Sequence, residues 1–354
     1  MSPKTTRHLS TRKGSRKAVP PAPPIAPPPV ATMTGNQPRS RFSTLQTGLQ
    51  ELGIPLLPPA ARARNPKKLR GGFTTRKRLS QLTQQELLTA VGELPADVVK
   101  QIGKRHPLLI PPFTNDTLRR AVQDYLAGGA RKKDIKEKYG EINNWDVSNV
   151  TDMSIMFSSE EATFFNQPLN KWNVSKVTNM SYMFGGATSF NQPLDNWNVS
   201  KVTNMRRMFC CAYSFNQPLN NWNVSNVTSM AWMFSNTRAF NQPLNNWNVS
   251  NLKDMNYMFM GAISFNQPLN KWNVSKVTNM GGMFEYAESF NQPLNKWNVS
   301  NVRDMGAMFS NATSFNQPLN NWDVSNVTYM SNMFDATTSF NQPLHAPWFT
   351  LFFL

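Results

Sequence analysis

The sequence has few of the residues that usually build catalytic and metal sites. Its three histidines, His8, His106 and His345, are far apart, and no Cys/His cluster has the spacing of a zinc site. The two cysteines, Cys210 and Cys211, are adjacent and cannot form a disulfide framework. They are either two small residues in a turn or a redox-active vicinal pair. We therefore expect a protein that is not an enzyme, with no catalytic residues, cofactor or metal ion.

Targeting segments are also missing. No run of about 18 apolar residues could cross a membrane as a helix, and residues 1–50 lack the apolar stretch of a signal peptide. Seven prolines in residues 19–30 would break an organelle transit helix. Glycosylation sequons such as Asn173-Val174-Ser175 recur along the chain, where glycans would crowd a repeat. We expect an intracellular location, in a host cytoplasm or nucleus or in a virion, rather than secretion.

Acidic residues are scarce in one part of the chain only. Residues 1–140 hold 26 Lys/Arg against 8 Asp/Glu, a balance of +18, whereas residues 141–354 hold 11 against 12, a balance of −1. A basic segment beside a neutral one predicts an arm that meets nucleic acid, an acidic surface or an anionic membrane. The alternative is that the charge only keeps a leader in solution.

Composition divides the chain into four parts. Residues 1–78 are a basic, proline-rich arm without hydrophobic period, for which we expect disorder. Residues 79–140 are a helical region that should cap the first unit of a repeat. Residues 141–344 are this tandem repeat, and residues 345–354 are an apolar tail. The tail is either a cap or the remnant of a ninth unit.

The helical region gives the clearest local signals. Apolar spacing predicts one helix in the stretch SQLTQQELLTAVGEL and another from Asp116 to about Leu126. Thr114 or Asn115 should cap the second helix, because their side chains accept hydrogen bonds from the first turn. A charged helix should then end at Gly140.

Tryptophan sets the period of the repeat. The first gap between unit-initial tryptophans is 27 residues and the other six are 25. These eight residues are Trp145, Trp172, Trp197, Trp222, Trp247, Trp272, Trp297 and Trp322. No unit of this size can bury its apolar side chains alone, so stacked units must share one core, as in a solenoid. The aromatic core should contain Trp172, Trp197, Trp222, Trp247, Trp272, Trp297 and Trp322 with Phe190, Phe215 and Phe265.

Each unit predicts a short strand, a helical or 3-10 turn and a polar turn. The alternation of Trp172 and Val174 suits a strand, and the apolar spacing of Val177 to Phe184 suits the helical turn. Asn and Gln of the motif FNQPL can bond to the turns above and below in side-chain ladders. Calcium binding by these turns is the alternative, although they carry few carboxylates.

The stretch FNQPLNNWNVSNVTSMAWMF resembles the BspA-like leucine-rich-repeat proteins, a repeat type of mycoplasma surface proteins also found in large DNA viruses and protists. The resemblance covers roughly residues 113–344. It implies a right-handed, leucine-rich-repeat-like solenoid that binds partners or mediates adhesion, and it implies no catalytic residues. The basic arm is not part of that pattern, which favours a viral or protist intracellular protein.

Positions that differ between otherwise copied units are free to serve function. The position before each Met-Phe pair and a second position six residues later form two such columns. They predict an interaction patch rich in the residues of interface hot spots: Tyr182, Arg206, Arg207, Tyr213, Trp232, Arg238 and Tyr257. The alternative is that these are solvated positions that diverged after duplication.

Two functions follow from these features. The first is a non-enzymatic scaffold that binds a protein partner through the repeats or mediates adhesion. The second is a nucleic-acid-associated or virion structural protein anchored by residues 1–78, whose lysines and arginines would bind phosphates weakly and without sequence specificity.

Overall fold

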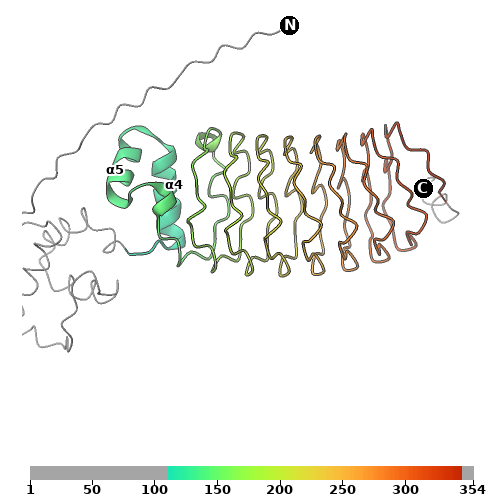
Figure 1. Cartoon of the computed structure of the whole chain (residues 1–354), viewed down its shortest axis with the longest axis horizontal. Helices are drawn as coiled ribbons and strands as arrows, with labels where there is room; N and C mark the ends of the chain where they lie inside the picture. The colour runs from blue at the N-terminus through green and yellow to red at the C-terminus, as the bar shows by residue number, and fades with distance from the viewer. Residues whose placement is uncertain (1–110, 345–354) are drawn as a thin grey trace, which may run out of the picture. The chain divides into compact units, whose positions relative to one another are not determined.

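The computed structural model describes residues 111–344. The arm at 1–78, the helix expected near residues 80–94 and the tail at 345–354 lie outside the described residues. The described chain begins with the helices α4 (Asn115–Leu126) and α5 (Gly129–Tyr139), followed by the 3-10 turn η4 (Ile142–Asn144). Successive 25-residue units then lie side by side in chain order (Figure 1). Within these described residues, no helix is both long and apolar enough to cross a membrane.

Helix α4 forms as its sequence predicts. Thr114 is the N-cap, and its hydroxyl accepts a hydrogen bond from the backbone of Thr117, whose side chain bonds back to Thr114 in a capping box. Leu118 and Val122 lie on its buried face. Helix α5 carries mostly charged side chains and ends at Gly140, where φ is +74° and glycine is unstrained.

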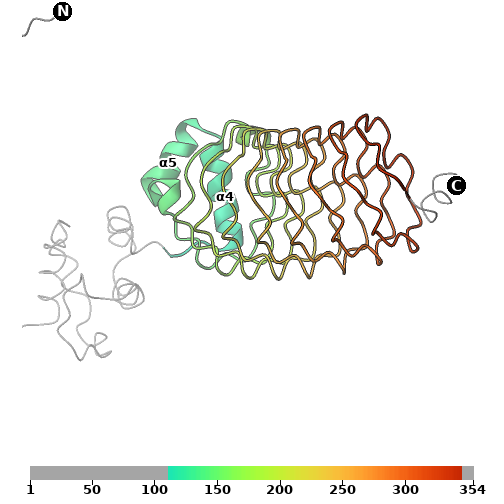
Figure 2. The same cartoon turned by 45° about the vertical axis from the view of Figure 1, so that its right-hand side comes forward.

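Helix α4 covers the first unit of the repeat, as Figure 2 shows. The ring of Trp145 packs against Phe113, Tyr125 and Tyr139, with ring centroids 5.1, 5.9 and 6.0 Å away. These contacts exclude water from the open end of the stack. They also continue the aromatic core into the helical region.

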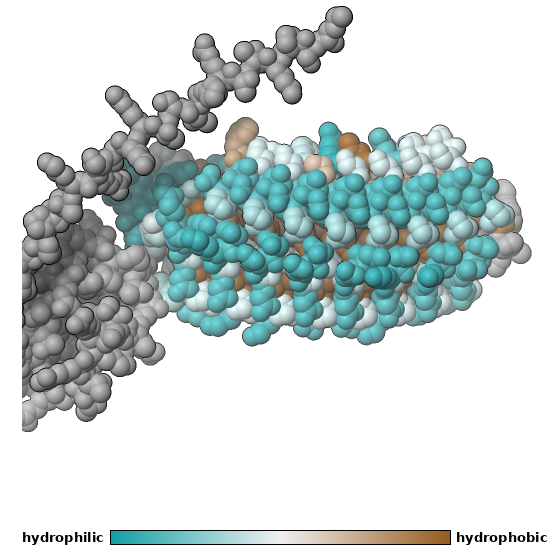
Figure 3. Space-filling model, viewed as in Figure 1, coloured by the Kyte–Doolittle hydropathy of each residue, from teal (hydrophilic) through white to brown (hydrophobic). Residues whose placement is uncertain are grey.

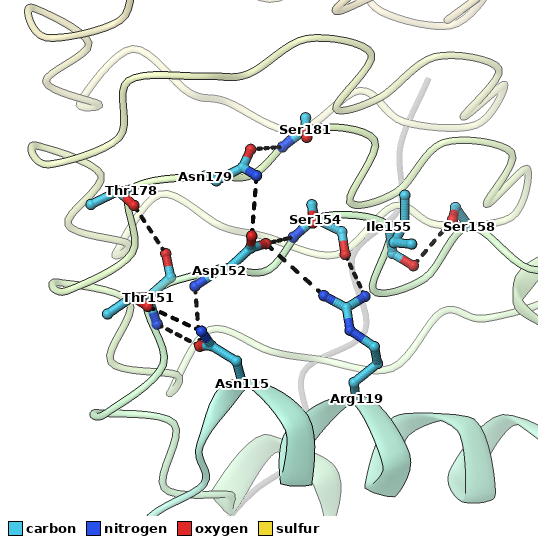
Figure 4. Close-up of polar contacts among 10 residues, drawn as sticks. All are labelled: Asn115, Arg119, Thr151, Asp152, Ser154, Ile155, Ser158, Thr178, Asn179 and Ser181. Atoms are coloured by element: carbon cyan, nitrogen blue, oxygen red, sulfur yellow. Dashed lines mark hydrogen bonds and ion pairs between the residues drawn. The ribbon is translucent and has the colours of Figure 1, made fainter.

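Two polar side chains of α4 replace a missing preceding unit (Figure 4). Asn115 Oδ1 accepts hydrogen bonds from the backbone N–H groups of Thr151, at 2.9 Å, and Asp152, at 3.2 Å. Arg119 donates to the carbonyl of Ser154 at 2.7 Å. In the next unit the equivalents of two of these groups bond to the preceding unit: the N–H of Thr178 donates to Thr151, and the carbonyl of Ser181 accepts from Ile155. The helix therefore satisfies backbone groups that the first unit would otherwise leave unpaired.

The repeat core is built from columns of identical side chains. Neighbouring indole rings, such as those of Trp197 and Trp222, lie parallel with centroids 6.5 Å apart. Each indole N–H from Trp197 onward donates to the carbonyl of a leucine 28 residues earlier, as Trp222 does to Leu194 at 2.9 Å. The ten aromatic residues expected in the core are all buried: Trp172, Trp197, Trp222, Trp247, Trp272, Trp297, Trp322, Phe190, Phe215 and Phe265.

Backbone pairing between units lies elsewhere than expected. Seven isolated parallel bridges join consecutive units among the described residues, and they fall on positions such as Asn179 and Asn204 rather than on the Trp172–Val174 segment. The reason is local. The N–H of Trp172 bonds to the carbonyl of Leu169, and the carbonyl of Val174 accepts from Val177, so turns on either side use these backbone groups instead.

The helical or 3-10 turn expected from Val177 to Phe184 is also absent. Every second N–H of this segment donates to the next unit, for example Tyr182 to the carbonyl of Arg206 at 2.8 Å and Phe184 to that of Met208 at 2.9 Å. Those N–H groups cannot then serve a helix. The segment is a series of turns that pairs with the neighbouring units, and φ is positive at Tyr182.

The polar turns form the predicted ladders. Asn216 Oδ1 accepts from the backbone N–H of Asn241 and from the side chain of Gln242, both at 3.0 Å. The same two bonds recur at units before and after it. Each asparagine thus links its turn to the following one, and this confirms the ladder interpretation of the FNQPL motif.

Candidate functional site

The candidate site lies on the variable position before each Met-Phe pair, which we call the first column. Its members differ in size, charge and polarity, yet all have left-handed backbone, with φ between 52° and 62°. They are Ile155, Tyr182, Arg207, Trp232, Tyr257, Gly282, Ala307 and Asn332. The backbone geometry at this position is therefore independent of the side chain.

Hydrogen bonds between units impose this geometry. The N–H of Arg207 donates to the carbonyl of Ala231 at 2.9 Å, and that of Trp232 donates to Asn256 at 2.9 Å. Left-handed backbone suits glycine and asparagine but strains bulky residues. Arginine, tryptophan and tyrosine are held in this geometry by the hydrogen bonds between their backbone and the next unit.

Three consecutive members of the first column form one continuous contact, the Arg–Trp–Tyr stack. The guanidinium carbon of Arg207 lies 5.0 Å from the centre of the Trp232 ring. The Trp232 and Tyr257 rings stack with centroids 4.2 Å apart and an interplanar angle of 30°. Both contacts have the geometry of favourable cation–π and aromatic interactions.

Gly282 provides the space into which the stack extends. A Cβ built on Gly282 would overlap the Tyr257 ring, so only glycine leaves this ring in place. The next unit thus accommodates the stack by lacking a side chain. The sequence alone predicted Tyr257 for the patch and no role for Gly282, although glycine in a column of larger residues was a visible signal.

A second variable column runs beside the first. There the guanidinium carbon of Arg238 lies 5.0 Å from the centre of the exposed Tyr213 ring. Between the two columns lie Cys210 and Cys211, with their sulfur atoms 3.6 Å apart. The structure therefore brings five of the seven predicted patch residues into two neighbouring cation–aromatic contacts.

The other two predicted residues take different positions. The Tyr182 ring lies over Gly185 of its own unit, 3.0 Å from where a Cβ would stand. Among the described ring contacts, none joins Tyr182 to the stack. Arg206 is exposed and adds its charge beside Arg207.

Charged side chains are unevenly distributed along this surface. Residues 196–250 contain four basic residues, Lys201, Arg206, Arg207 and Arg238, and no Asp or Glu. Figure 3 shows hydrophilic side chains in rows that run from unit to unit over the visible face. At the other end of the stack, burial raises the pKa of Tyr257, and Glu285 and Asp304 raise it further.

Burial also raises the pKa of Glu285 itself. The stack therefore has arginines at its Arg207 end and the carboxylates of Glu285 and Asp304 near Tyr257. A ligand that follows the stack would meet a positive end and a negative end.

The comparison with known families gives the classification. The model of the family described as "Mycoplasma protein of unknown function, DUF285" matches residues 130–245 and 269–350, more than half of the chain. The chain belongs to this family. The DUF285 match covers most of the stacked units and part of helix α5, and the family's description gives no function. No curated protein matches the chain.

Proposed function

We propose that this DUF285 protein is a non-enzymatic interaction scaffold, a right-handed solenoid of the leucine-rich-repeat type similar to the BspA-like repeats. The stacked units would present the two variable columns as a binding surface for a protein partner. Shared core columns and inter-unit hydrogen bonds support this, because they make a rigid platform whose surface positions can vary.

The Arg–Trp–Tyr stack carries the proposal. Trp, Tyr and Arg are the residues enriched in interface hot spots, and here they occupy consecutive positions of one column. Divergence without selection would favour residues that tolerate left-handed backbone, such as Gly282 and Asn332. Three bulky residues at strained positions, already packed on one another, favour a functional patch instead.

The chemistry of the patch favours an acidic partner segment. Four basic residues and no acidic residue lie within residues 196–250. Carboxylates would pair with Arg206, Arg207 and Arg238, and apolar or aromatic side chains of the partner would extend the contact with Trp232. Charge complementarity of this kind sets the orientation and accelerates association.

Peptide display on the full chain tests this function. We expect selected peptides to be enriched in Asp and Glu next to an aromatic residue, and to lose at least tenfold in affinity on Trp232→Asn. Asparagine suits left-handed backbone, as Asn332 in the same column shows, so the substitution preserves the fold. Arg207→Gln should weaken binding and reduce its salt dependence.

The matched control is Asn332→Ala, which changes the same column at an exposed position outside the patch. It should leave peptide affinity unchanged. Peptides without acidic enrichment, or equal affinities for the wild-type chain and Trp232→Asn, would contradict an acidic partner at this patch.

A polyanion-binding arm is the second candidate function, favoured by charge alone. Residues 1–78 contain 16 Lys/Arg and a single acidic residue, Glu51. We expect the full chain to bind heparin or DNA with steep salt dependence and a chain lacking residues 1–78 to lose this binding. Equal retention of both chains would instead point to the arginines around Arg207.

A further inference from the structure

The two cysteines lie side by side at the centre of the variable surface. Their sulfur atoms are 3.6 Å apart, both thiols are free, and both side chains are half-buried. They are also the only two cysteines of the chain. At this distance the thiol of Cys210 can donate a hydrogen bond to the sulfur of Cys211.

The surroundings of Cys211 favour its thiolate. The hydrogen bond from Cys210 lowers the pKa of Cys211 to about 7, the charges of Arg207 and Arg238 lower it too, and burial opposes them. The same hydrogen bond and burial raise the pKa of Cys210, which therefore keeps its proton. No carboxylate occurs in residues 196–250, the stretch that holds both cysteines and both arginines, to compete for these arginines.

These arginines are themselves held in place. Arg207 is fixed over Trp232 and Arg238 over Tyr213, each with its guanidinium carbon 5.0 Å from the ring centre. Cys211 comes between the members of the two columns in its unit, Arg207 and Tyr213, and its backbone is left-handed, with φ at 60°. The positive charge that acts on its sulfur thus comes from two arginines that each contact an aromatic ring.

We propose that Cys211 is a nucleophilic thiolate and a site of oxidation by hydroperoxides, with Cys210 as its hydrogen-bond donor. Thiolates of this kind sit in electropositive, partly exposed surroundings, whereas buried structural cysteines are inert. The proposal depends only on the thiol pair and its two arginines, so it holds whether or not the surface binds a partner.

The reaction consumes one hydroperoxide for each Cys211. The thiolate sulfur attacks one peroxide oxygen, an S–O bond forms and the O–O bond breaks. Sulfur gives up two electrons, and the second oxygen leaves as hydroxide or alkoxide and takes a proton from water. The product is the sulfenic acid of Cys211, beside the unoxidised Cys210 and the two guanidinium groups.

Alkylation of the folded full chain tests the nucleophile directly. Iodoacetamide is applied from pH 5.5 to 9, and fragment-ion mass spectrometry assigns the adduct to Cys210 or Cys211. We expect Cys211 to react roughly tenfold faster than Cys210 at pH 7, with a rate midpoint near pH 7. Hydrogen peroxide followed by dimedone should then add one dimedone, on Cys211.

Matched variants test the cause of this reactivity. Arg207→Gln combined with Arg238→Gln should move the midpoint upward and slow alkylation several-fold at pH 7. Arg303 is an exposed arginine in a distant unit, and Arg303→Gln should change neither the midpoint nor the rate. Cys210→Ser should slow the reaction without abolishing it.

Three results would overturn the proposal. They are faster reaction at Cys210 than at Cys211, a midpoint at the value of an ordinary thiol, and alkylation only after unfolding in urea. The wild-type measurement needs no variant, so a variant that fails to fold does not remove the test.

Discussion

The core columns repeat the same side chain from unit to unit, whereas the first column changes its side chain at almost every unit. Every unit-initial position holds tryptophan, and its ring is buried against identical neighbours. The first column holds side chains of very different kinds, from Gly282 to Trp232, at the same left-handed geometry. Hydrogen bonds between units order both columns, through the indole N–H of each tryptophan and through the backbone N–H of the first column. An ordered column therefore does not need identical side chains.

The difference shows which positions of the repeat must stay constant and which can vary. A core side chain must fit the same residue above and below, and any change creates a void in two contacts. A first-column side chain projects away from that core, while its backbone N–H still bonds to the next unit. Backbone pairing thus stabilises the stack whatever the side chain, and it leaves this surface free to diverge.

The largest expected effect is the difference in unfolding free energy between one Trp→Ala substitution in the tryptophan column of the core and one in the first column. Trp247→Ala removes an indole that stacks on Trp222 and donates to Leu219, and should cost about 3–5 kcal/mol of unfolding free energy. Trp232→Ala removes an indole of the first column and should cost about 1 kcal/mol or less. Urea denaturation of both variants measures the difference. Equal losses would erase the distinction between core and surface columns.

The polar ladder should have an intermediate effect. Asn241 accepts from the N–H of Asn266 and the side chain of Gln267, both at 3.0 Å and half-buried. Asn241→Ala leaves these donors unpaired and should cost about 1–3 kcal/mol. Asn220→Ala is the control, since Asn220 is exposed and should change stability by less than about 0.5 kcal/mol. A loss as small as that of the control would show that the ladder contributes little to stability.

Local signals in the sequence predicted the elements whose cause is local. The second helix was expected from Asp116 to about Leu126 and spans Asn115–Leu126, because the capping residue Thr114 and the apolar spacing are both visible. The end of α5 at Gly140 was visible for the same reason. The polar ladders followed from recurring Asn and Gln at one position.

The pairing between units could not be predicted in the same way. The N–H groups that point to the next unit depend on where the left-handed residues lie. The first column has no common residue type from which a left-handed backbone could be recognised. Only Gly282 and Asn332 have side chains typical of that geometry. Grouping Cys211 with Arg207 and Arg238 required the same information, because Arg238 comes from the following unit.

The helical cap offers a smaller and local test. Asn115→Ala removes the acceptor for the backbone N–H groups of Thr151 and Asp152, so the first unit should open more often. We expect a loss of about 1 kcal/mol, seen as faster hydrogen exchange at these two amides. Exchange at the central units, for example at Tyr257, should not change. Unaltered exchange at Thr151 would show that α4 covers the first unit through its apolar face alone.

The smallest expected effect is a difference in the direction of the thermal midpoint shift between two Ala→Gly substitutions. Ala307 lies in the first column with φ at 52°, whereas Ala312, five residues later in the same unit, is fully buried and has ordinary backbone. Ala307→Gly relieves the strain of left-handed alanine, by about 1 kcal/mol, and loses a similar amount or less because glycine gains freedom in the unfolded chain. Ala312→Gly gains nothing in return and also loses a buried methyl group, so it should cost about 1–2 kcal/mol. Thermal unfolding should therefore show an unchanged or slightly raised midpoint for Ala307→Gly and a lowered one for Ala312→Gly. If both substitutions lower the midpoint equally, the first column is packed as tightly as the core, and its variability is not the freedom that a binding surface needs.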